Sequence, residues 1–372
     1  MRYISFLIKP ASSACNLRCK YCFYEDESIN RKEKSYGVMA KSTVDALLKK
    51  AYAEIEAPGY ICFAFQGGEP TLAGLDYFRY FVKKAKENKP AGVELAFSIQ
   101  TNGTLLDEQW ALFLKENNFL VGISIDGNKA LHNKYRVDSS GKGSYEKALQ
   151  GYRLLEKYGV DTNALCVVTS SLACQGKNAY KALKELGFSY LQFIAVLDPL
   201  GERKGLASYS LPPDMYGRFL CEVFDLYYED WKKGDYHSIR LFDDYIHLLL
   251  GDNCSTCATV GRCGGYFVVE GDGSIYPCDF YVLDGYKEGN ILENSLNEIS
   301  KGEVFAKFLA RGKNKPEECY ECKYRKLCNG GCPNDYQGGH NYYCSSFKAL
   351  FHYAITRMME MANAEIEARA RR

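Results

Sequence analysis

Short apolar runs alternate with amphipathic segments along the first 235 residues. The runs that are apolar throughout lie at residues 61–65, 119–125 and 164–168. Apolar side chains also recur at helical spacing at residues 44–51, 78–85 and 179–186. A strand that is apolar throughout is covered on both faces, and strands that alternate with helices form parallel sheets. The pattern therefore predicts an α/β fold.

The strand and helix pattern repeats six times, with units that start near residues 4, 60, 94, 119, 161 and 190. Because a closed barrel needs eight such units, six units predict either an open partial barrel or a doubly wound sheet. In both architectures the ligand site forms at the carboxyl ends of the strands. Two prolines then predict the start of a long helix, which runs from Pro213 through Trp231.

The character of the chain changes after Gly251. Cysteines become frequent, Gly-rich turns separate them, and little helical periodicity is left. An apolar stripe that begins at Phe347 then predicts a C-terminal helix. We therefore predict three domains, which are an α/β domain at residues 1–235, a cysteine-rich domain at residues 236–345 and a helix at residues 346–372.

The amino-acid composition excludes some classes of function. The 47 Lys and Arg residues nearly balance the 46 Asp and Glu residues, and a net charge of +1 gives no overall attraction to nucleic acid or to a membrane surface. A hydrophobic fraction of 47% is typical of a folded chain. Neither a signal-peptide core nor a membrane-spanning run is found, so we expect a cytoplasmic protein. In that reducing compartment, 16 cysteines in 372 residues indicate metal or redox sites rather than disulfides.

The first cysteine cluster, Cys15-x3-Cys19-x2-Cys22, follows the predicted strand at residues 3–9. Three thiolates can hold three irons of a 4Fe-4S cluster and leave the fourth iron open to another ligand. A structural zinc ion is the alternative, although such sites need four protein ligands and no histidine lies nearby. The spacing favours an iron-sulfur cluster that binds a small molecule.

The cluster spacing, with Tyr21 immediately before Cys22, resembles the signature of the radical S-adenosylmethionine (AdoMet) superfamily. After the second strand, Gln66-Gly67-Gly68-Glu69-Pro70 is similar to the Gly-Gly-Glu-Pro element of that superfamily. The resemblance implies that Gly67, Gly68 and Glu69 hold the methionine amino group of AdoMet. It further implies the ribose, carboxylate and adenine contacts of AdoMet, which would come in that order from Ser124, Arg136 and the backbone of Leu197, with Tyr21 beside the adenine.

Polar residues at the strand ends also suit a hydroxyl-rich ligand. They are Gln100, Thr101, Asn102, Ser124, Asp126 and Thr169. Each of them could equally cap a helix, and Arg136 could equally be a surface charge. The residues alone leave both interpretations open.

A second group of cysteines near the C-terminus reads Cys319-x2-Cys322-x5-Cys328-x3-Cys332-Pro333, followed by Cys344. In two-cluster ferredoxins the cysteine before such a proline serves the other cluster. The same exchange here predicts one set of ligands formed by Cys319, Cys322, Cys328 and Cys344. The other set would be Cys257, Cys263, Cys278 and Cys332. A zinc ribbon is the alternative, because paired Cys-x-x-Cys motifs often bind zinc.

Five cysteines are left outside these sets. Cys254 is close enough in sequence to replace Cys257, which the resemblance favours. The other four are expected to be small buried side chains: Cys62, Cys166, Cys174 and Cys221.

The complete pattern resembles radical AdoMet enzymes with the auxiliary-cluster domain called SPASM, and within them the anaerobic sulfatase-maturating enzymes. The likeness rests on residues 8–13, 63–74, 100–104 and 276–281. It implies a partial (β/α)6 TIM-like barrel, a SPASM-type domain and a C-terminal helix. It also implies three 4Fe-4S clusters and AdoMet as cofactors.

The resemblance implies that the enzyme oxidises a Cys or Ser in a Cys/Ser-x-Ala/Pro-x-Arg segment of a sulfatase to Cα-formylglycine. Asp279, directly after Cys278, would be the catalytic base. An electron donor such as flavodoxin or ferredoxin is expected. The alternative is another SPASM-type peptide-modifying enzyme, for example one that forms thioethers. A zinc-structured adaptor protein does not explain the open three-cysteine cluster. Preference for Cys or Ser, the sulfatase itself and the oligomeric state have no sequence signal.

Overall fold

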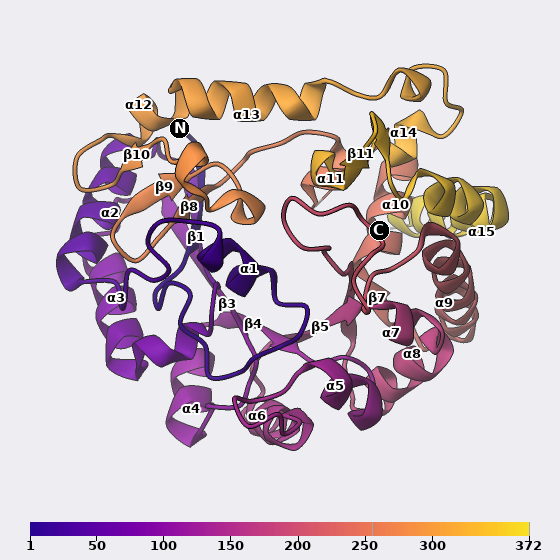
Figure 1. Cartoon of the computed structure of the whole chain (residues 1–372), viewed down its shortest axis with the longest axis horizontal. Helices are drawn as coiled ribbons and strands as arrows, with labels where there is room; N and C mark the ends of the chain where they lie inside the picture. Colours follow the sequence, from indigo (N-terminus) through magenta and orange to yellow (C-terminus); the bar gives the residue numbers. More distant parts are fainter. Residues whose placement is uncertain (255, 372) are drawn as a thin grey trace. The chain divides into compact units, whose positions relative to one another are not determined.

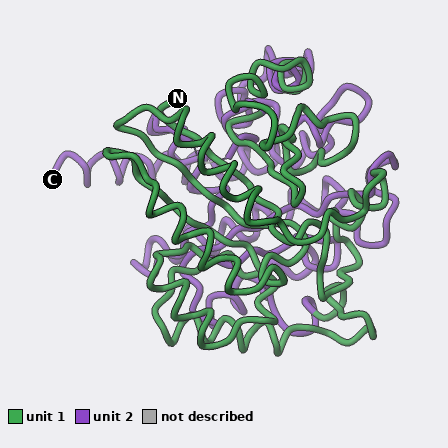
Figure 2. Tube along the Cα trace, turned by 90° about the vertical axis from the view of Figure 1, so that its left-hand side faces the viewer, with its two compact units in different colours: residues 1–124, 133–162, 264–308 green, residues 125–132, 163–263, 309–372 purple. Residues whose placement is uncertain are grey.

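The computed structural model describes residues 1–254 and 256–371, and the chain divides into two compact units (Figure 2). Unit 1 comprises residues 1–124, 133–162 and 264–308. Unit 2 comprises residues 125–132, 163–263 and 309–372. The chain thus passes between the units several times, and segments far apart in sequence belong to the same unit.

The sheet of unit 1 has the strand order β10-β9-β8-β1-β2-β3-β4. Its strands are β1 (Tyr3–Ile8), β2 (Gly59–Phe65), β3 (Val93–Thr101), β4 (Phe119–Ser124), β8 (Phe267–Val269), β9 (Ser274–Tyr276) and β10 (Gly289–Asn290). The strands β8, β1, β2, β3 and β4 are parallel, whereas β9 is antiparallel to its two neighbours. Parallel strands place their carboxyl ends at one edge of the sheet, where the sequence predicts the site.

A row of phenylalanine side chains holds these parallel strands in register. Phe6, Phe63, Phe97 and Phe119 are paired across β1, β2, β3 and β4. Their ring centroids are 5.7, 5.8 and 5.3 Å apart from one strand to the next, and the rings are stacked. Each such pair contributes about 0.5–1.5 kcal/mol beyond the burial of its area. The row explains why these apolar runs form strands with a single register.

The helices of unit 1 are α1 (Phe23–Ile29), α2 (Lys41–Glu54), α3 (Leu75–Glu87), α4 (Glu108–Glu116), α6 (Tyr145–Lys157) and α12 (Leu296–Ser300). Figure 1 shows α2, α3 and α4 on the outer side of the strands. The apolar face of α3, which includes Phe78 and Phe81, packs edge-on against Phe65 with centroids 4.9 and 5.0 Å apart. The amphipathic pattern predicted at residues 78–85 is therefore the sheet-facing side of α3.

Unit 2 contains the strands β5 (Thr162–Val168), β6 (Tyr190–Ala195) and β7 (Ser238–Ile239), which are parallel, and the small hairpin of β11 (Tyr336–Gln337) and β12 (His340–Asn341). Its helices are α7 (Ser170–Ala173), α8 (Gly176–Glu185), α9 (Pro213–Lys233), α10 (Arg240–Leu250), α11 (Cys257–Val260), α14 (Arg325–Cys328) and α15 (Cys344–Ala370). Two helices cross between the units, α5 (Lys129–Tyr135) and α13 (Glu303–Lys313).

The structure confirms the α/β fold and the six predicted strands, which begin within one residue of the expected positions. The long helix predicted from Pro213 is α9, and the C-terminal helix α15 begins at Cys344; the last residue of the predicted segment, 372, lies outside the described part. Among the described residues, none of the helices combines the length and the apolarity that crossing a bilayer requires. The domain boundaries at residues 235 and 345 stay predictions.

The expectation of little helix in the cysteine-rich region was wrong. Helix α13 spans eleven residues there, because Phe305 and Phe308 follow one another at helical spacing and are both 4% exposed. The same region also supplies β8, which pairs in parallel with β1. Turn-forming glycines around these elements conceal the short periodic segments in the sequence.

Helix α6 packs unusually close to the loop that follows β3. A Cβ atom on Gly151 of α6 would lie 2.1 Å from the carbonyl oxygen of Gly103, which is well inside van der Waals contact. Gly103 follows Thr101 and Asn102, two of the predicted site residues. Glycine at position 151 thus lets the helix support that loop directly.

We expect Gly151→Ala to destabilise the protein by about 1–3 kcal/mol, because the new methyl group must displace backbone. Alanine in place of glycine inside a helix is ordinarily stabilising by roughly 0.5–1 kcal/mol. Urea unfolding followed by circular dichroism measures the difference, and Gln150→Ala at the exposed neighbouring position is the matched control. A higher midpoint for Gly151→Ala than for the unmodified chain would contradict the close packing.

Candidate active site and cysteine clusters

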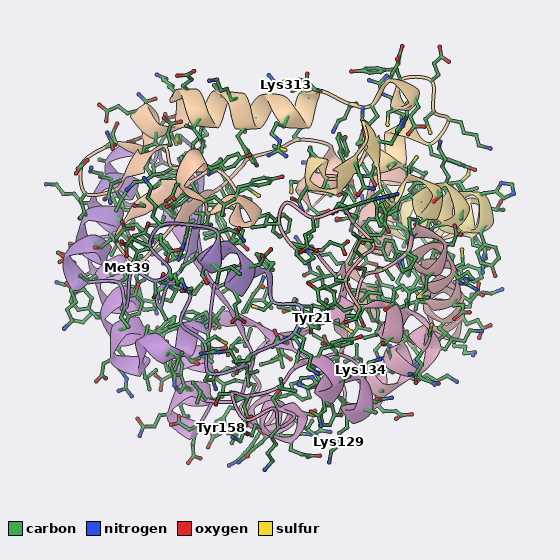
Figure 3. The ribbon with its side chains drawn as sticks, viewed as in Figure 1. Tyr21, Met39, Lys129, Lys134, Tyr158 and Lys313 are labelled. Carbon is green, nitrogen blue, oxygen red and sulfur yellow. The ribbon has the colours of Figure 1, made fainter. Side chains whose placement is uncertain are left out.

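The loop that carries the first three cysteines begins after β1 and ends at α1, of which Cys22 is the N-cap. It runs antiparallel to the segment around Tyr135, because Arg18 N donates to Val137 O at 2.6 Å and Lys20 N donates to Tyr135 O at 3.0 Å. This pairing places the guanidinium of Arg136 5.5 Å from the ring centroid of Tyr21, a residue labelled in Figure 3. The structure therefore brings together Tyr21, Arg136 and the three-cysteine loop.

The thiols of Cys15 and Cys22 are partly buried, and the effect of burial on them outweighs that of the nearby arginines. The pKa of Cys15 is raised to about 11, mainly by burial and also by the neighbouring Glu69 and Cys22, although the Leu17 amide and Arg18 act in the opposite direction. Burial also raises the pKa of Cys22. A thiolate is the form that binds metal, and a bound metal is what stabilises a thiolate in such surroundings. Three cysteines on one loop, two of them with thiolates that burial disfavours, suit an iron-sulfur cluster.

Glu69 is fixed below this loop by hydrogen bonds to both of its oxygens. Its Oε1 accepts from the backbone and hydroxyl of Thr71, at 3.1 and 2.6 Å, and from Thr101 Oγ1 at 2.7 Å. Its Oε2 accepts from Asn102 N at 2.7 Å. The carboxylate is 1% exposed and its pKa is raised by burial, against which these donors act. Thr101 and Asn102, predicted as ligand-facing groups, instead orient Glu69.

Gly68 is needed because the chain approaches the cysteine loop at this point. It has a φ of +53°, and a Cβ atom there would lie 2.3 Å from the carbonyl oxygen of Ala14. The next amide, Glu69 N, donates to that same oxygen at 2.7 Å. The Gly-Gly-Glu-Pro element and the cysteine loop are thus locked together through Ala14, the residue before Cys15.

The remaining predicted AdoMet contacts, Ser124 and Leu197, come from two different units. Ser124 is the last residue of β4 in unit 1, and Leu197 follows β6 in unit 2. Two other polar strand ends have structural roles, since Thr169 caps α7 through Leu172 N at 3.3 Å and Asp126 accepts from Val167 N at 2.9 Å. For these two residues, the capping and scaffolding interpretation holds.

Asp279 lies at the start of a short 3-10 helix, Asp279–Tyr281, and is 5% exposed. Its Oδ2 accepts from Tyr24 Oη and from Gln66 Nε2, both at 2.7 Å. Its Oδ1 is buried and has no hydrogen-bond partner among the described residues. Burial raises the pKa of Asp279, although Lys9 and the two donors act in the opposite direction. One oxygen is therefore held in place and the other is left ready to accept a proton.

A buried group of charges surrounds Lys9 near Asp279. The Lys9 ammonium is 3.4 Å from Glu27 Oε2 and 3.6 Å from Glu270 Oε2, and Arg31 also pairs with Glu270 at 2.8 Å. Burial lowers the pKa of Lys9, but the two glutamates outweigh it and raise the pKa overall. Burial raises the pKa of Glu27 to about 7, since Lys9 offsets only part of the desolvation.

Sequence reasoning missed most of this charge group. Gln66 stood in a quoted motif without a role, and Tyr24 was not singled out. The available signal was Lys9 itself, because a lysine at the end of an apolar strand is buried only if partners compensate its charge. Its partners Glu27 and Glu270 are too distant in sequence to be found by spacing.

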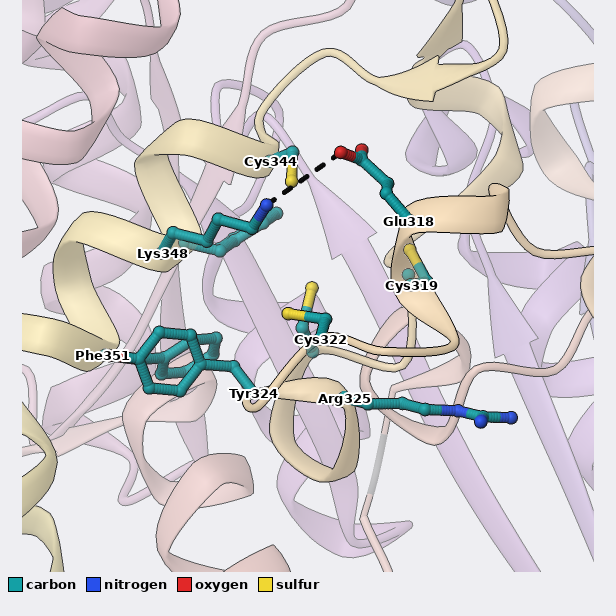
Figure 4. Close-up of a pocket in the computed structure, with 11 residues that line it drawn as sticks. Glu318, Cys319, Cys322, Tyr324, Arg325, Cys344, Lys348 and Phe351 are labelled. Carbon is teal, nitrogen blue, oxygen red and sulfur yellow. Dashed lines mark ion pairs between the residues drawn. The ribbon is translucent and has the colours of Figure 1, made fainter.

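The set Cys319, Cys322, Cys328 and Cys344 lines one small pocket in unit 2. Figure 4 shows the sulfur atoms of Cys319, Cys322 and Cys344 around a common space, with the Glu318–Lys348 ion pair of 3.9 Å beside them. Burial raises the pKa of Cys328 to about 12, and the other three thiols add to that increase. The structure brings these four predicted ligands together, and their chemistry fits a closed metal site.

The cysteines of the other predicted ligand set belong to different units. Cys257, Cys263 and Cys332 belong to unit 2, whereas Cys278 belongs to unit 1, where it accepts from Tyr266 Oη at 3.6 Å. After burial, the thiol of Cys257 is the largest influence that raises the pKa of Cys263.

The cysteines outside the sets behave differently from one another. Cys254, the alternative to Cys257 as a ligand, donates to Asp244 O at 3.4 Å. Cys166 is buried, as expected, but Cys174 is exposed and lies 3.9 Å from the Met215 sulfur, so its predicted burial was wrong. Cys174 is the C-cap of the four-residue helix α7, whose last residue, Ala173, is buried, so the chain leaves the core at the cap.

Comparison with protein families gives two matches. Residues 10–173 match the model of the radical SAM superfamily, and residues 257–323 match the SPASM model, an iron-sulfur cluster-binding domain. The first match contains the three-cysteine loop, Glu69 and Arg136. The second contains Asp279 and most of the later cysteines.

Individual relatives match over nearly the whole chain. The chain is 45% identical to the cysteine-type anaerobic sulfatase-maturating enzyme of Clostridium perfringens (strain 13 / Type A), over 97% of this chain and 98% of the relative. It is 32% identical to the serine-type enzyme of Bacteroides thetaiotaomicron, over 95% and 89%. A solved structure of native anSMEcpe with bound AdoMet and the Cp18Cys peptide has a TM-score of 0.92 and 44% identity, and covers 97% of this chain and 99% of that chain.

We expect Lys9→Met to destabilise the protein by about 3–5 kcal/mol, because it leaves buried carboxylates without their shared cation. Urea unfolding measures the loss. Lys34→Met, at an exposed position, should stay within about 0.5 kcal/mol of the unmodified chain. An unchanged unfolding midpoint for Lys9→Met would contradict the assignment of Lys9 as the central cation.

Proposed function

The chain belongs to the anaerobic sulfatase-maturating enzymes of the radical SAM superfamily, and we propose that it oxidises a cysteine in a sulfatase polypeptide to Cα-formylglycine. The observation that carries the proposal is the Asp279 carboxylate, buried beside Cys278 with one oxygen held and one unpartnered among the described residues. A general base needs such an oxygen within reach of the substrate proton. The cysteine preference is supported by the higher identity to the cysteine-type relative.

The cofactors of this family are 4Fe-4S clusters and AdoMet. We assign the AdoMet-binding cluster to Cys15, Cys19 and Cys22. The auxiliary clusters take two sets of four thiolates, which are Cys257, Cys263, Cys278 and Cys332 for one, and Cys319, Cys322, Cys328 and Cys344 for the other. When bound, these groups supply a 5′-deoxyadenosyl radical that removes one hydrogen atom from the target Cβ, and an acceptor for one electron.

The protein's own residues bind and orient the reactants and move the proton. Glu69 is fixed to receive the methionine ammonium of AdoMet, and Arg136, beside Tyr21, suits its carboxylate. Ser124 and the backbone of Leu197 complete the proposed contacts. Tyr24 and Gln66 fix Asp279 Oδ2, so that Oδ1 takes the thiol proton of the target.

The chemistry balances with these assignments. The target cysteine loses a hydrogen atom from Cβ, a proton from its thiol and one electron, and gives a thioaldehyde. Water converts the thioaldehyde to the aldehyde of formylglycine and releases hydrogen sulfide. The substrate is a short unfolded Cys-x-Ala/Pro-x-Arg segment. A flavodoxin or ferredoxin supplies electrons, and the many free thiols suit the reducing cytoplasm.

The function is tested with a synthetic peptide that contains Cys-x-Pro-x-Arg, incubated anaerobically with AdoMet and a reductant. We expect an aldehyde product by mass spectrometry together with 5′-deoxyadenosine, and a slower reaction with the serine peptide. The variant with alanine at Cys15, Cys19 and Cys22 should lose about four irons and form neither product. A peptide that loses only two hydrogens through a cross-link would show a thioether-forming enzyme instead.

Asp279→Asn should reduce formylglycine formation by about 100-fold or more, because an amide cannot accept the proton. Iron content and 5′-deoxyadenosine formation should stay at the level of the unmodified enzyme. Asp284→Asn, at an exposed position five residues further on, is the control. Normal formylglycine formation by Asp279→Asn would exclude Asp279 as the base.

A further inference from the structure

Two polar groups in unit 2 are buried beside the C-terminal cysteines without a partner. Lys315 follows α13, and its ammonium nitrogen is fully buried with no hydrogen-bond acceptor among the described residues. The hydroxyl of Tyr336, in β11, is in the same situation. A buried donor without a partner destabilises the folded state, and a charged donor does so more strongly. Both groups therefore indicate a partner that the polypeptide itself does not supply.

Gly330 marks the place where these two side chains meet a cysteine. A Cβ atom on Gly330 would lie 3.0 Å from Lys315 Cδ, 3.0 Å from Tyr336 Oη and 3.7 Å from Cys319 Sγ. The side chain of Lys315, the Tyr336 hydroxyl and the Cys319 thiol thus surround one small region. Glycine there, with a φ of +79°, leaves the space between them free of side chain.

The thiols that act on the two groups come from both proposed auxiliary sets. Burial lowers the pKa of Lys315, and four cysteines oppose that decrease. Burial raises the pKa of Tyr336, and the same four cysteines add to the increase. These are Cys263 and Cys332 of one set and Cys319 and Cys328 of the other. Lys315 and Tyr336 therefore lie within electrostatic range of both sets.

The path of the chain confirms that α13 leads into this region. A Cβ atom on Gly312, near the end of α13, would lie 2.3 Å from Cys263 N and 3.0 Å from Cys263 Sγ. Three residues after Gly312 the chain reaches Lys315, and four residues later it reaches Cys319. The segment thus runs from Gly312, which packs against the proposed ligand Cys263, to Cys319, a proposed ligand of the other set.

We propose that the Lys315 ammonium and the Tyr336 hydroxyl donate hydrogen bonds to sulfur atoms of the two auxiliary clusters and raise their reduction potentials. The proposal rests on the cysteine assignment made under the proposed function. A 4Fe-4S cluster with four thiolates is an anion and becomes more negative when it is reduced. A cation and hydrogen-bond donors at its sulfurs favour the reduced form. Lys315 and Tyr336 are positioning residues that make the clusters better electron acceptors.

The test uses the full chain, reconstituted anaerobically with iron and sulfide. Reduction potentials are measured by redox titration followed by electron paramagnetic resonance, and iron is counted per chain. Lys315→Met removes the charge at similar length, Lys315→Arg keeps it, and Tyr336→Phe removes only the hydroxyl. Lys313→Met, at an exposed position at the end of α13 and two residues before Lys315 (Figure 3), is the matched control.

For Lys315→Met we expect about twelve irons per chain and an auxiliary-cluster reduction that is at least tenfold less favourable. For a one-electron step this is a shift of about 59 mV to lower potential. Tyr336→Phe should shift the potential in the same direction by less, and Lys315→Arg should restore it. The cluster proposed at Cys15, Cys19 and Cys22 is an internal reference whose potential should not change.

Unchanged auxiliary potentials in Lys315→Met at full iron content would overturn the proposal. If that variant loses iron, Tyr336→Phe decides, because an unshifted potential in it overturns the proposal and a lowered one supports it. Fewer than about twelve irons in the unmodified chain would instead contradict the cysteine assignment itself. The two failures are therefore distinguished before any variant is compared.

Discussion

The buried ammonium of Lys9 is the contact on which the rest of the active site depends. It joins the end of β1 to Glu27 of α1 and to Glu270, which follows β8. It also lies 4.8 Å from the ring centroid of Tyr24, whose hydroxyl holds Asp279. A Cβ atom on Gly67 would lie 2.6 Å from the Lys9 side chain, so the Gly-Gly-Glu-Pro element is also built around it. A single desolvated cation thus positions Asp279 and the Gly-Gly-Glu-Pro element relative to one strand.

The site residues share a second property, because several are buried with bonding capacity that the polypeptide leaves unused. The Cys15 thiol has a raised pKa, Asp279 Oδ1 has no donor and Lys315 Nζ has no acceptor among the described residues. Desolvated groups of this kind destabilise the folded state, and a fold tolerates them where a substrate or cofactor supplies the missing partner. The same physical argument therefore supports the proposed cluster at Cys15, the proposed base and the proposed auxiliary clusters.

The sequence predicts those parts of this arrangement that depend on local spacing. The six strands, the three-cysteine loop and the Gly-Gly-Glu-Pro element are all short-range patterns. The pairing of Tyr24 with Asp279 joins residues 255 positions apart, and no spacing rule reaches that far. Thr101 and Asn102 were correctly placed at a strand end, but whether they face a ligand or serve the fold was left open, because sequence cannot show that their donors are used by Glu69. Helix α13 was missed because only two phenylalanines define its buried face.

The sum of the charges around Lys9 explains why Asp279 suits its proposed role as a general base. Lys9 and Arg31 face the three carboxyl groups of Glu27, Glu270 and Asp279, so the fully ionised group has one negative charge in excess. Burial is the main cause that raises the pKa of Glu27 to about 7, and the negative charge of Asp279 contributes to it. A proton delivered to Asp279 makes the count neutral. The surroundings of Asp279 therefore favour protonation of its carboxyl group, and the adjacent Cys278 places a proposed cluster ligand one peptide unit away.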